Sequence, residues 1–129
     1  MANNPVVWFE IYVQDMDRAK AFYESVFSVR LVPLAGPEME EKMEMEMWAF
    51  PMDEKGAGAS GALVKMEGCA SGGNSTLVYF TCADCAVEAS RAAAGGGSIF
   101  KEKFSIGQYG FIALVIDPEG NMIGLHSMQ

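Results

Sequence analysis

The chain has 129 residues, half of them apolar and a fifth charged, which fits one globular domain with its own core and excludes intrinsic disorder. Its formal net charge of -8 excludes nucleic acid as a partner, because binding a phosphate backbone depends on Lys and Arg displacing counterions. No secretory leader begins the chain and no run approaches the roughly 18 apolar residues of a membrane span, so we expect a cytoplasmic protein without a membrane partner.

The first half of the chain has the pattern of a strand, a helix and further strands. Apolar side chains alternate along residues 6–13, which predicts a strand. Asp15 is a typical helix-capping residue, and apolar positions within 17–27 follow helical spacing, which predicts an amphipathic helix packed on a sheet. Strands are then predicted at 43–50 and 62–66. One apolar face in the first of these, suited to core or dimer packing, consists of Met43, Met45 and Met47.

The second half repeats this order. Residues 68–75 are rich in Gly and Ser, which predicts a flexible connection. A strand is predicted at 76–82 and a helix at 84–94, where three glycines end the helix. The last three strands are predicted at residues 98–102, 111–116 and 122–127.

The two halves align with one another at a constant offset. Trp8 then corresponds to Leu77, and the capping residue of the first helix corresponds to that of the second. The agreement lies in the order of the elements more than in residue identities. We therefore predict two βαβββ modules, about 5–67 and 76–129, joined by the linker 68–75 within a single α+β domain.

The three cysteines do not indicate a disulfide framework, because their number is odd and no secretory context is present. Cys82 and Cys85 have the C-x-x-C spacing of zinc and redox sites, but no second pair completes a zinc site. Small, buried or partly buried residues are the favoured interpretation.

Three motifs suggest a family. They are the first strand and helix up to Phe22-Tyr23, the Gly-Gly-Gly97 after the second helix, and the Asp117-Pro-Glu-Gly-Asn121 turn before the last strand. In this order they resemble the glyoxalase/bleomycin resistance/dioxygenase (vicinal oxygen chelate) superfamily. The resemblance implies a curved mixed sheet of eight strands, four from each module, that encloses a ligand cup, and it implies a homodimer.

Metal-using relatives take His, Glu or Gln ligands from the first and last strand of each module. The corresponding positions here are Trp8, Leu77, Gly124 and, within one or two residues, Gly61. None of these side chains has a donor for a divalent metal, so no metal is predicted. No nucleotide-binding fingerprint is present either, so we predict no cofactor. The positions then form a cavity with Trp8 as a stacking wall, or Trp8 and Leu77 plug the cup.

Side chains alternate across a strand, so Glu10 and Tyr12 share the face of Trp8. The same rule turns Tyr79 and His126 toward the cup. Glu10 and His126 are therefore the candidate catalytic residues of a proton-transfer pair, since burial raises a carboxyl pKa and imidazole titrates near neutrality. Alternatively, the two side chains hydrogen-bond each other or the backbone to satisfy polar groups in the sheet.

The loop at 104–110 is flanked by glycines and precedes the penultimate strand. It forms a lid with Tyr109 at its tip, or it is a plain hairpin connection. The expected ligand-binding residues are Trp8, Tyr12, Leu77, Tyr79, Tyr109 and Gly124.

The leading functional hypothesis is a metal-free, glyoxalase-like protein whose cup binds a small organic molecule, to sequester it or present it to another protein. The alternative is a lyase or isomerase that uses Glu10 and His126, or a metal at shifted positions. A structural or interaction module with a plugged cup ranks third, because fold does not fix function.

Overall fold

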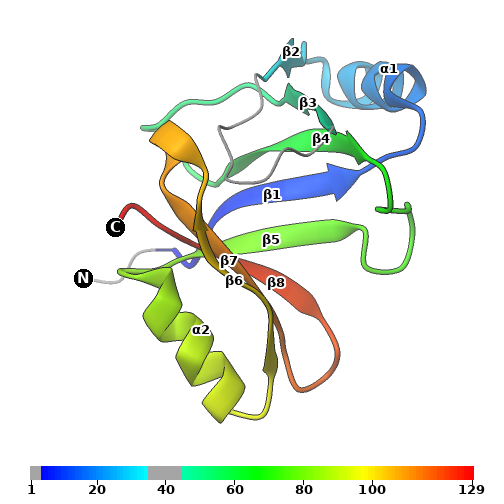
Figure 1. The fold of residues 1–129 in the computed structure, drawn as a ribbon. Coiled ribbons are helices and arrows are strands. Elements are labelled where there is room, and N and C mark those ends of the chain that lie inside the picture. Colours follow the sequence, from blue (N-terminus) through cyan, green and yellow to red (C-terminus); the bar gives the residue numbers. More distant parts are fainter. Residues whose placement is uncertain (1–3, 35–44) are drawn as a thin grey trace.

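The structure, a computed structural model, describes residues 4–34 and 45–129, and its elements follow the predicted order (Figure 1). The elements are β1 (Val6–Tyr12), α1 (Met16–Phe27), β2 (Val32–Pro33), β3 (Met45–Ala49), β4 (Ser60–Met66), β5 (Thr76–Thr81), α2 (Cys85–Ala94), β6 (Ser98–Ser105), the short 3-10 helix η1 (Gly107–Tyr109), β7 (Phe111–Ile116) and β8 (Met122–Ser127). Met43, at the start of one predicted strand, lies outside the described residues. Within those residues, no helix has the length and apolar character needed to cross a bilayer.

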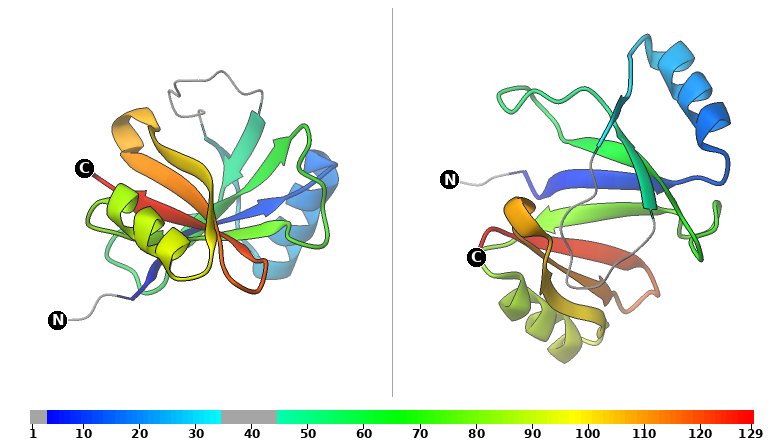
Figure 2. Two further views of the ribbon diagram at one scale, coloured as in Figure 1. Left: turned by 60° about the horizontal axis from the view of Figure 1, so that its bottom comes forward. Right: turned by 45° about the horizontal axis from the view of Figure 1, so that its top comes forward.

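The strands of the described residues form one mixed sheet in the order β2-β3-β4-β1-β5-β8-β7-β6. In each half the first strand lies parallel to the last, β1 beside β4 and β5 beside β8, whereas β1 and β5 pair antiparallel at the centre. Figure 2 shows the sheet as curved, with the strands at both of its ends rising on the same side. The predicted α+β fold with a curved mixed sheet of eight strands is confirmed.

The register at the centre of the sheet is symmetric. Trp8 lies opposite Tyr79, Phe9 opposite Val78, and Glu10 opposite Leu77. The alignment of the two halves makes Trp8 equivalent to Leu77 and Glu10 equivalent to Tyr79. A twofold rotation about the pair formed by Phe9 and Val78 therefore exchanges the two halves. We propose residues 68–75 as the boundary between them.

Both helices lie on one face of the sheet and are capped by aspartates. The Asp15 side chain accepts a hydrogen bond from Arg18 N at 3.1 Å, and that of Asp84 accepts one from Ala86 N at 3.1 Å. Each helix then buries small or apolar residues against the sheet. For α2 these residues and their partners are Cys85, Ala89, Ala113, Val115 and Leu125, and for α1 they are Met16, Leu31 and Leu63.

The C-x-x-C pair contributes to this packing. Cys85 is fully buried and Cys82 is partly buried. Burial, reinforced by the nearby carboxylate of Glu88, raises the pKa of the Cys82 thiol to about 11. Thiolate is the reactive and metal-binding form of cysteine, and it is scarce here at neutral pH.

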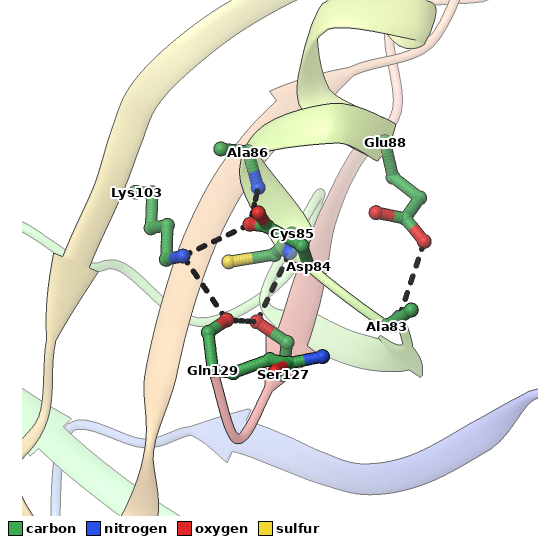
Figure 3. A network of polar contacts seen from close by, with 8 residues as sticks. All are labelled: Ala83, Asp84, Cys85, Ala86, Glu88, Lys103, Ser127 and Gln129. Carbon is green, nitrogen blue, oxygen red and sulfur yellow. Dashed lines mark hydrogen bonds and ion pairs between the residues drawn. The ribbon is translucent and has the colours of Figure 1, made fainter.

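A polar network ties the start of α2 to the last residues of the chain (Figure 3). The Ser127 hydroxyl, in a residue only 1% exposed, accepts a hydrogen bond from Cys85 N at 3.0 Å and donates one to the carbonyl oxygen of Gln129 at 2.9 Å. Lys103 Nζ bonds Asp84 at 2.9 Å and the same Gln129 oxygen at 3.0 Å. The buried part of this network fixes where α2 begins on the sheet.

Replacing Ser127 by alanine is expected to lower the free energy of unfolding by about 1–3 kcal/mol, because the buried Cys85 N–H loses its acceptor. Urea denaturation measures this change. Lys103→Met is the control, since it breaks the solvent-exposed part of the network and should have a smaller effect. Equal losses in the two variants would contradict the importance of the buried hydrogen bond.

Candidate functional site

The face of the sheet that turns away from α1 and α2 is here called the inner face. The strand register places Trp8, Glu10 and Tyr12 on it. Its apolar side chains form two clusters, and Trp8 and Tyr12 pack against both. The buried members are Leu77, Tyr79, Ile106 and Ile112 in one cluster and Met47, Ala62 and Val64 in the other. The middle of β1 therefore lies where the two halves of the inner face meet.

Glu10 is bonded to three aromatic side chains on this face. Tyr12 OH donates to its Oε1 at 2.7 Å, Tyr79 OH to the same oxygen at 3.3 Å, and Trp8 Nε1–H to its Oε2 at 3.2 Å. Glu10 and two of its three partners remain partly exposed. A carboxylate has about four acceptor positions, so one position on Oε2 stays open. The arrangement is an anchored carboxylate that can accept one more hydrogen bond.

The ionisation of this group reflects its surroundings. Burial raises the pKa of Glu10 above its usual 4.5, against the opposing effect of the hydrogen bonds from Tyr12, Trp8 and Tyr79. Burial, together with the adjacent carboxylate, also raises the pKa of Tyr12 and that of Tyr79, so both phenols stay protonated donors. No Lys, Arg or His side chain that the structure describes bonds to Glu10. The described groups that donate hydrogen bonds to this carboxylate are thus all neutral.

This environment predicts a pH dependence of stability. Because the pKa of Glu10 is raised in the folded state, that state holds more protons than the unfolded state as pH rises above 4.5. The contribution of Glu10 to the free energy of unfolding therefore falls as pH rises through this window, and Glu10→Gln should remove that fall. Urea denaturation of both proteins across about pH 4 to 8 measures the difference in slope.

Glu46 provides the matched control for this experiment. It accepts a hydrogen bond from Trp48 Nε1, two residues away, at 2.9 Å, as Glu10 does from Trp8, but it is exposed on the other face of the sheet. Glu46→Gln removes a carboxyl of the same kind from an exposed position, and the fall that comes from Glu10 should persist in this variant. An unchanged slope in Glu10→Gln would show that the carboxyl of Glu10 is as well solvated when folded as when unfolded.

One of the expected metal-ligand positions is located more closely by the strand register. Tyr79 pairs with Gly124, and Glu10, the equivalent of Tyr79, pairs with Ala62. Ala62 is therefore the counterpart of Gly124; it lies one residue from Gly61, within the expected range of one or two residues. Gly61 lies opposite Phe9 on the helix-covered face, where an added Cβ would lie 2.7 Å from the Phe9 ring. A shift of one residue along a strand changes the face.

The four positions, with Ala62 in place of Gly61, do not fit a divalent metal. Trp8, Leu77, Ala62 and Gly124 present an indole N–H, an isobutyl group, a methyl group and a hydrogen, none of which is a metal ligand. The ring of Tyr79 covers Gly124, since a Cβ there would lie 2.8 Å from its Cγ. Elsewhere too, the described part of the chain has no group of three His, Cys, Asp or Glu side chains that could hold a metal ion.

His126 lies apart from Glu10. Its Nε2 is 2.6 Å from the carbonyl oxygen of Tyr109, and it pairs with Thr81, whereas Glu10 pairs with Leu77. These partners are four residues apart on β5, roughly 13 Å at about 3.3 Å per residue. The predicted convergence of the two side chains on one point is therefore not found, because alternation determines the face of a residue and not its height along the strand.

The loop before β7 meets the inner face through a residue that the sequence analysis missed. Tyr109, in η1, is 39% exposed, and the predicted ligand contact of its side chain stays a prediction. Ile106, at the start of the same loop, is buried against Leu77 and Tyr79. Ile106 is an apolar residue between Ser105 and the glycine that begins η1, and this is the sequence feature that could have indicated its burial. The loop thus covers part of the inner face.

Comparisons with known proteins agree with this fold. A model of the Glyoxalase/Bleomycin resistance protein/Dioxygenase superfamily matches residues 6–125. No curated protein matches the chain in sequence. Among solved structures, methylmalonyl-CoA epimerase from Mycobacterium tuberculosis is similar with a TM-score of 0.66 and 16% identity, over 97% of this chain and 88% of that one.

Two further structures are similar. A variant of Streptomyces coelicolor methylmalonyl-CoA epimerase in complex with 2-nitronate-propionyl-CoA has a TM-score of 0.64 and 16% identity, and 98% of each chain is covered. A hypothetical protein from Bacillus halodurans has a TM-score of 0.66 and 10% identity, over 96% of this chain and 94% of that one. At these identities the likeness shows the fold alone.

Proposed function

The chain belongs to the glyoxalase/bleomycin resistance protein/dioxygenase superfamily, and on this premise we propose that its inner face binds a small organic molecule with Glu10 as the polar anchor. The observation that carries the proposal is the carboxylate of Glu10, held by Trp8, Tyr12 and Tyr79 with one acceptor position open. Binding sites for small molecules combine apolar and aromatic walls with a few fixed polar groups, as this face does.

We propose further that binding needs no divalent metal. The side chains at the family's ligand positions support this, since indole, isobutyl, methyl and hydrogen are not metal ligands. Glu10 and Tyr79 are the next residues on the same face after Trp8 and Leu77, and they supply polar groups instead. A ligand is then held by hydrogen bonds and by contact with aromatic surface.

A thermal unfolding screen with a chemically varied set of small organic molecules tests this function. Binding to the folded state raises the unfolding midpoint, and the rise should persist in the presence of chelator. It should be lost in Trp8→Ala and kept in Trp48→Ala, because Trp48 lies on the other face of the sheet. Stabilisation that survives Trp8→Ala, or that requires added metal, would contradict the proposal.

The second candidate is an enzyme that moves a proton with Glu10. The raised pKa of this partly exposed carboxyl favours it, since general bases are tuned toward neutrality by burial. The epimerases that share this fold suggest the first substrate to test, methylmalonyl-CoA. Wild-type protein in D₂O should then exchange the proton beside the thioester carbonyl, and Glu10→Gln should bind the substrate without exchange.

In the enzyme proposed as the second function, His126 would act separately from Glu10. If it takes part, His126→Asn should lower the exchange rate; its distance from Glu10 along the sheet argues for action at a different atom of the substrate. Absence of exchange in the wild-type protein would exclude methylmalonyl-CoA as its substrate.

We propose that the protein is a cytoplasmic homodimer, as members of this superfamily often dimerise. Phe22, Val26 and Phe27 support the dimer, since these apolar side chains of α1 are 58%, 54% and 61% exposed. Large apolar groups on a surface are typical of interfaces. Light scattering of wild-type protein and of Phe22→Ser with Phe27→Ser should show a dimer and a monomer.

A further inference from the structure

We infer that the ligand of the inner face is an organic cation, with an ammonium or amidinium group on an apolar body. This inference rests on the proposed binding function and names the class of ligand. It is based on the aromatic groups that surround Glu10 and on the lack of a cationic group among its described hydrogen-bond partners.

In the part of the chain that the structure describes, no cationic side chain bonds to the Glu10 carboxylate. Three donors reach the carboxylate of Glu10, and all three, the Trp8 indole and the Tyr12 and Tyr79 phenols, are neutral. A carboxylate withdrawn from water is costly unless it is paired with a cation or protonated. The direction of the Glu10 pKa agrees, because the hydrogen bonds from Tyr12, Trp8 and Tyr79 do not offset the effect of burial. A cationic ligand would supply the absent charge.

The groups around the Glu10 carboxylate are aromatic. The π faces of Trp and Tyr attract ammonium and guanidinium-like groups, most strongly when water is excluded. Three such side chains lie within hydrogen-bonding distance of one carboxylate here, and apolar residues continue the surface on both sides of them. The carboxylate matches the charge of such a ligand, and the apolar clusters match its body.

Among the described residues, the thiol of Cys69 lies near Glu10, and burial together with the Glu10 carboxylate raises its pKa, so this thiol brings no positive charge. Two other charged or polar side chains of the inner face lie further away. On β6, Lys101 pairs with Leu114, and its ammonium is 5.3 Å from the centre of the Phe104 ring. On β8, His126 is bonded to the carbonyl oxygen of Tyr109. The printed donors to Glu10 are Trp8, Tyr12 and Tyr79, so within residues 4–34 and 45–129 the charge at the middle of the face is that of the Glu10 carboxylate.

Binding of simple probes tests the inference. The cations are phenyltrimethylammonium and benzamidinium, and tert-butylbenzene is the neutral compound with the shape of the first. Dissociation constants are measured by ligand-observed NMR titration with wild-type protein, Glu10→Gln and Glu46→Gln. Circular dichroism confirms that each variant is folded.

We expect the wild-type protein to bind a cation more tightly than the neutral compound. Loss of a charged partner weakens an interaction by about 10- to 100-fold, which is the expected change in Glu10→Gln. Glu46→Gln should bind as the wild-type protein does, although its net charge changes equally. Cation affinity in the wild-type protein should rise with pH as the Glu10 carboxyl loses its proton.

Three results would overturn the inference. Equal weakening in Glu10→Gln and Glu46→Gln would mean that the net charge of the protein attracts the probes. Tight binding of tert-butylbenzene that does not depend on Glu10 would leave the proposed binding function standing and remove the cationic class. Failure of both cations to bind would likewise remove it, and the proposed function would still be judged by the thermal screen.

Discussion

Replacing Tyr79 by alanine is expected to lower the free energy of unfolding by about 3–5 kcal/mol, the range for removing a buried aromatic ring. Tyr79 is 6% exposed and packs with Leu77, Ile106 and Ile112. Its ring also covers Gly124, so its removal opens a cavity that neighbouring side chains fill only in part. Urea denaturation monitored by circular dichroism measures the loss.

Tyr79→Phe separates the ring from its hydroxyl. This variant keeps the packing and loses only the hydrogen bond to Glu10, which is worth about 1 kcal/mol. A similar, small loss in both variants would show that the ring does not fill the space above Gly124. In that case the space would be open to a ligand or a metal.

Gly61→Ala is expected to lower the free energy of unfolding by about 3 kcal/mol, at the upper end for overpacking. The added Cβ would overlap the carbonyl oxygen of Phe9 and lie 2.7 Å from its ring. Because the overlap involves the backbone of β1, the β1–β4 ladder must shift to relieve it. Urea denaturation measures this loss as well.

Gly58→Ala is the control for the backbone. Gly58 has a φ of 86° and nothing within 4 Å of an added Cβ, so alanine there meets only the strain of the left-handed conformation, about 1–2 kcal/mol. Gly61→Ala should therefore be the more destabilised variant. The opposite order would contradict the placement of Gly61 on the helix-covered face.

Much of the fold could be predicted because its patterns are local. Alternation along residues 6–13 and a capping aspartate before each helix are short-range features, and the structure contains the elements that they indicate. The same alternation put Trp8, Glu10 and Tyr12 on one face. The hydrogen bonds among these three side chains follow from neighbours two residues apart in the sequence.

The positions that the sequence did not predict depend on how separate strands align with one another. The pairing of Glu10 with Ala62, and of His126 with Thr81, follows from the register of separate strands, which no short segment encodes. For this reason the sequence pattern indicated Gly61 in place of Ala62 and predicted that Glu10 and His126 lie close together. The burial of Ile106 against Leu77 likewise depends on how a loop returns across the sheet.

The centre of the inner face has polar groups although the positions expected to bind metal lack donors. Tyr79 and Glu10 are equivalent residues of the two halves, and they meet across the central pair of strands. The Tyr79 ring takes the space at Gly124, and the Glu10 carboxylate becomes the polar centre of the face. Under the proposed function, aromatic packing around one carboxylate takes the place of a metal-ligand set drawn from four strands.

Native mass spectrometry of untagged protein purified without chelator is the most informative single experiment, because one spectrum reports subunit number, bound metal and retained small molecules. We expect a dimer without metal, whose added mass, where present, is that of an organic molecule. A stoichiometric divalent metal in the wild-type protein would contradict the reading of Trp8, Ala62, Leu77 and Gly124 as positions that bind none.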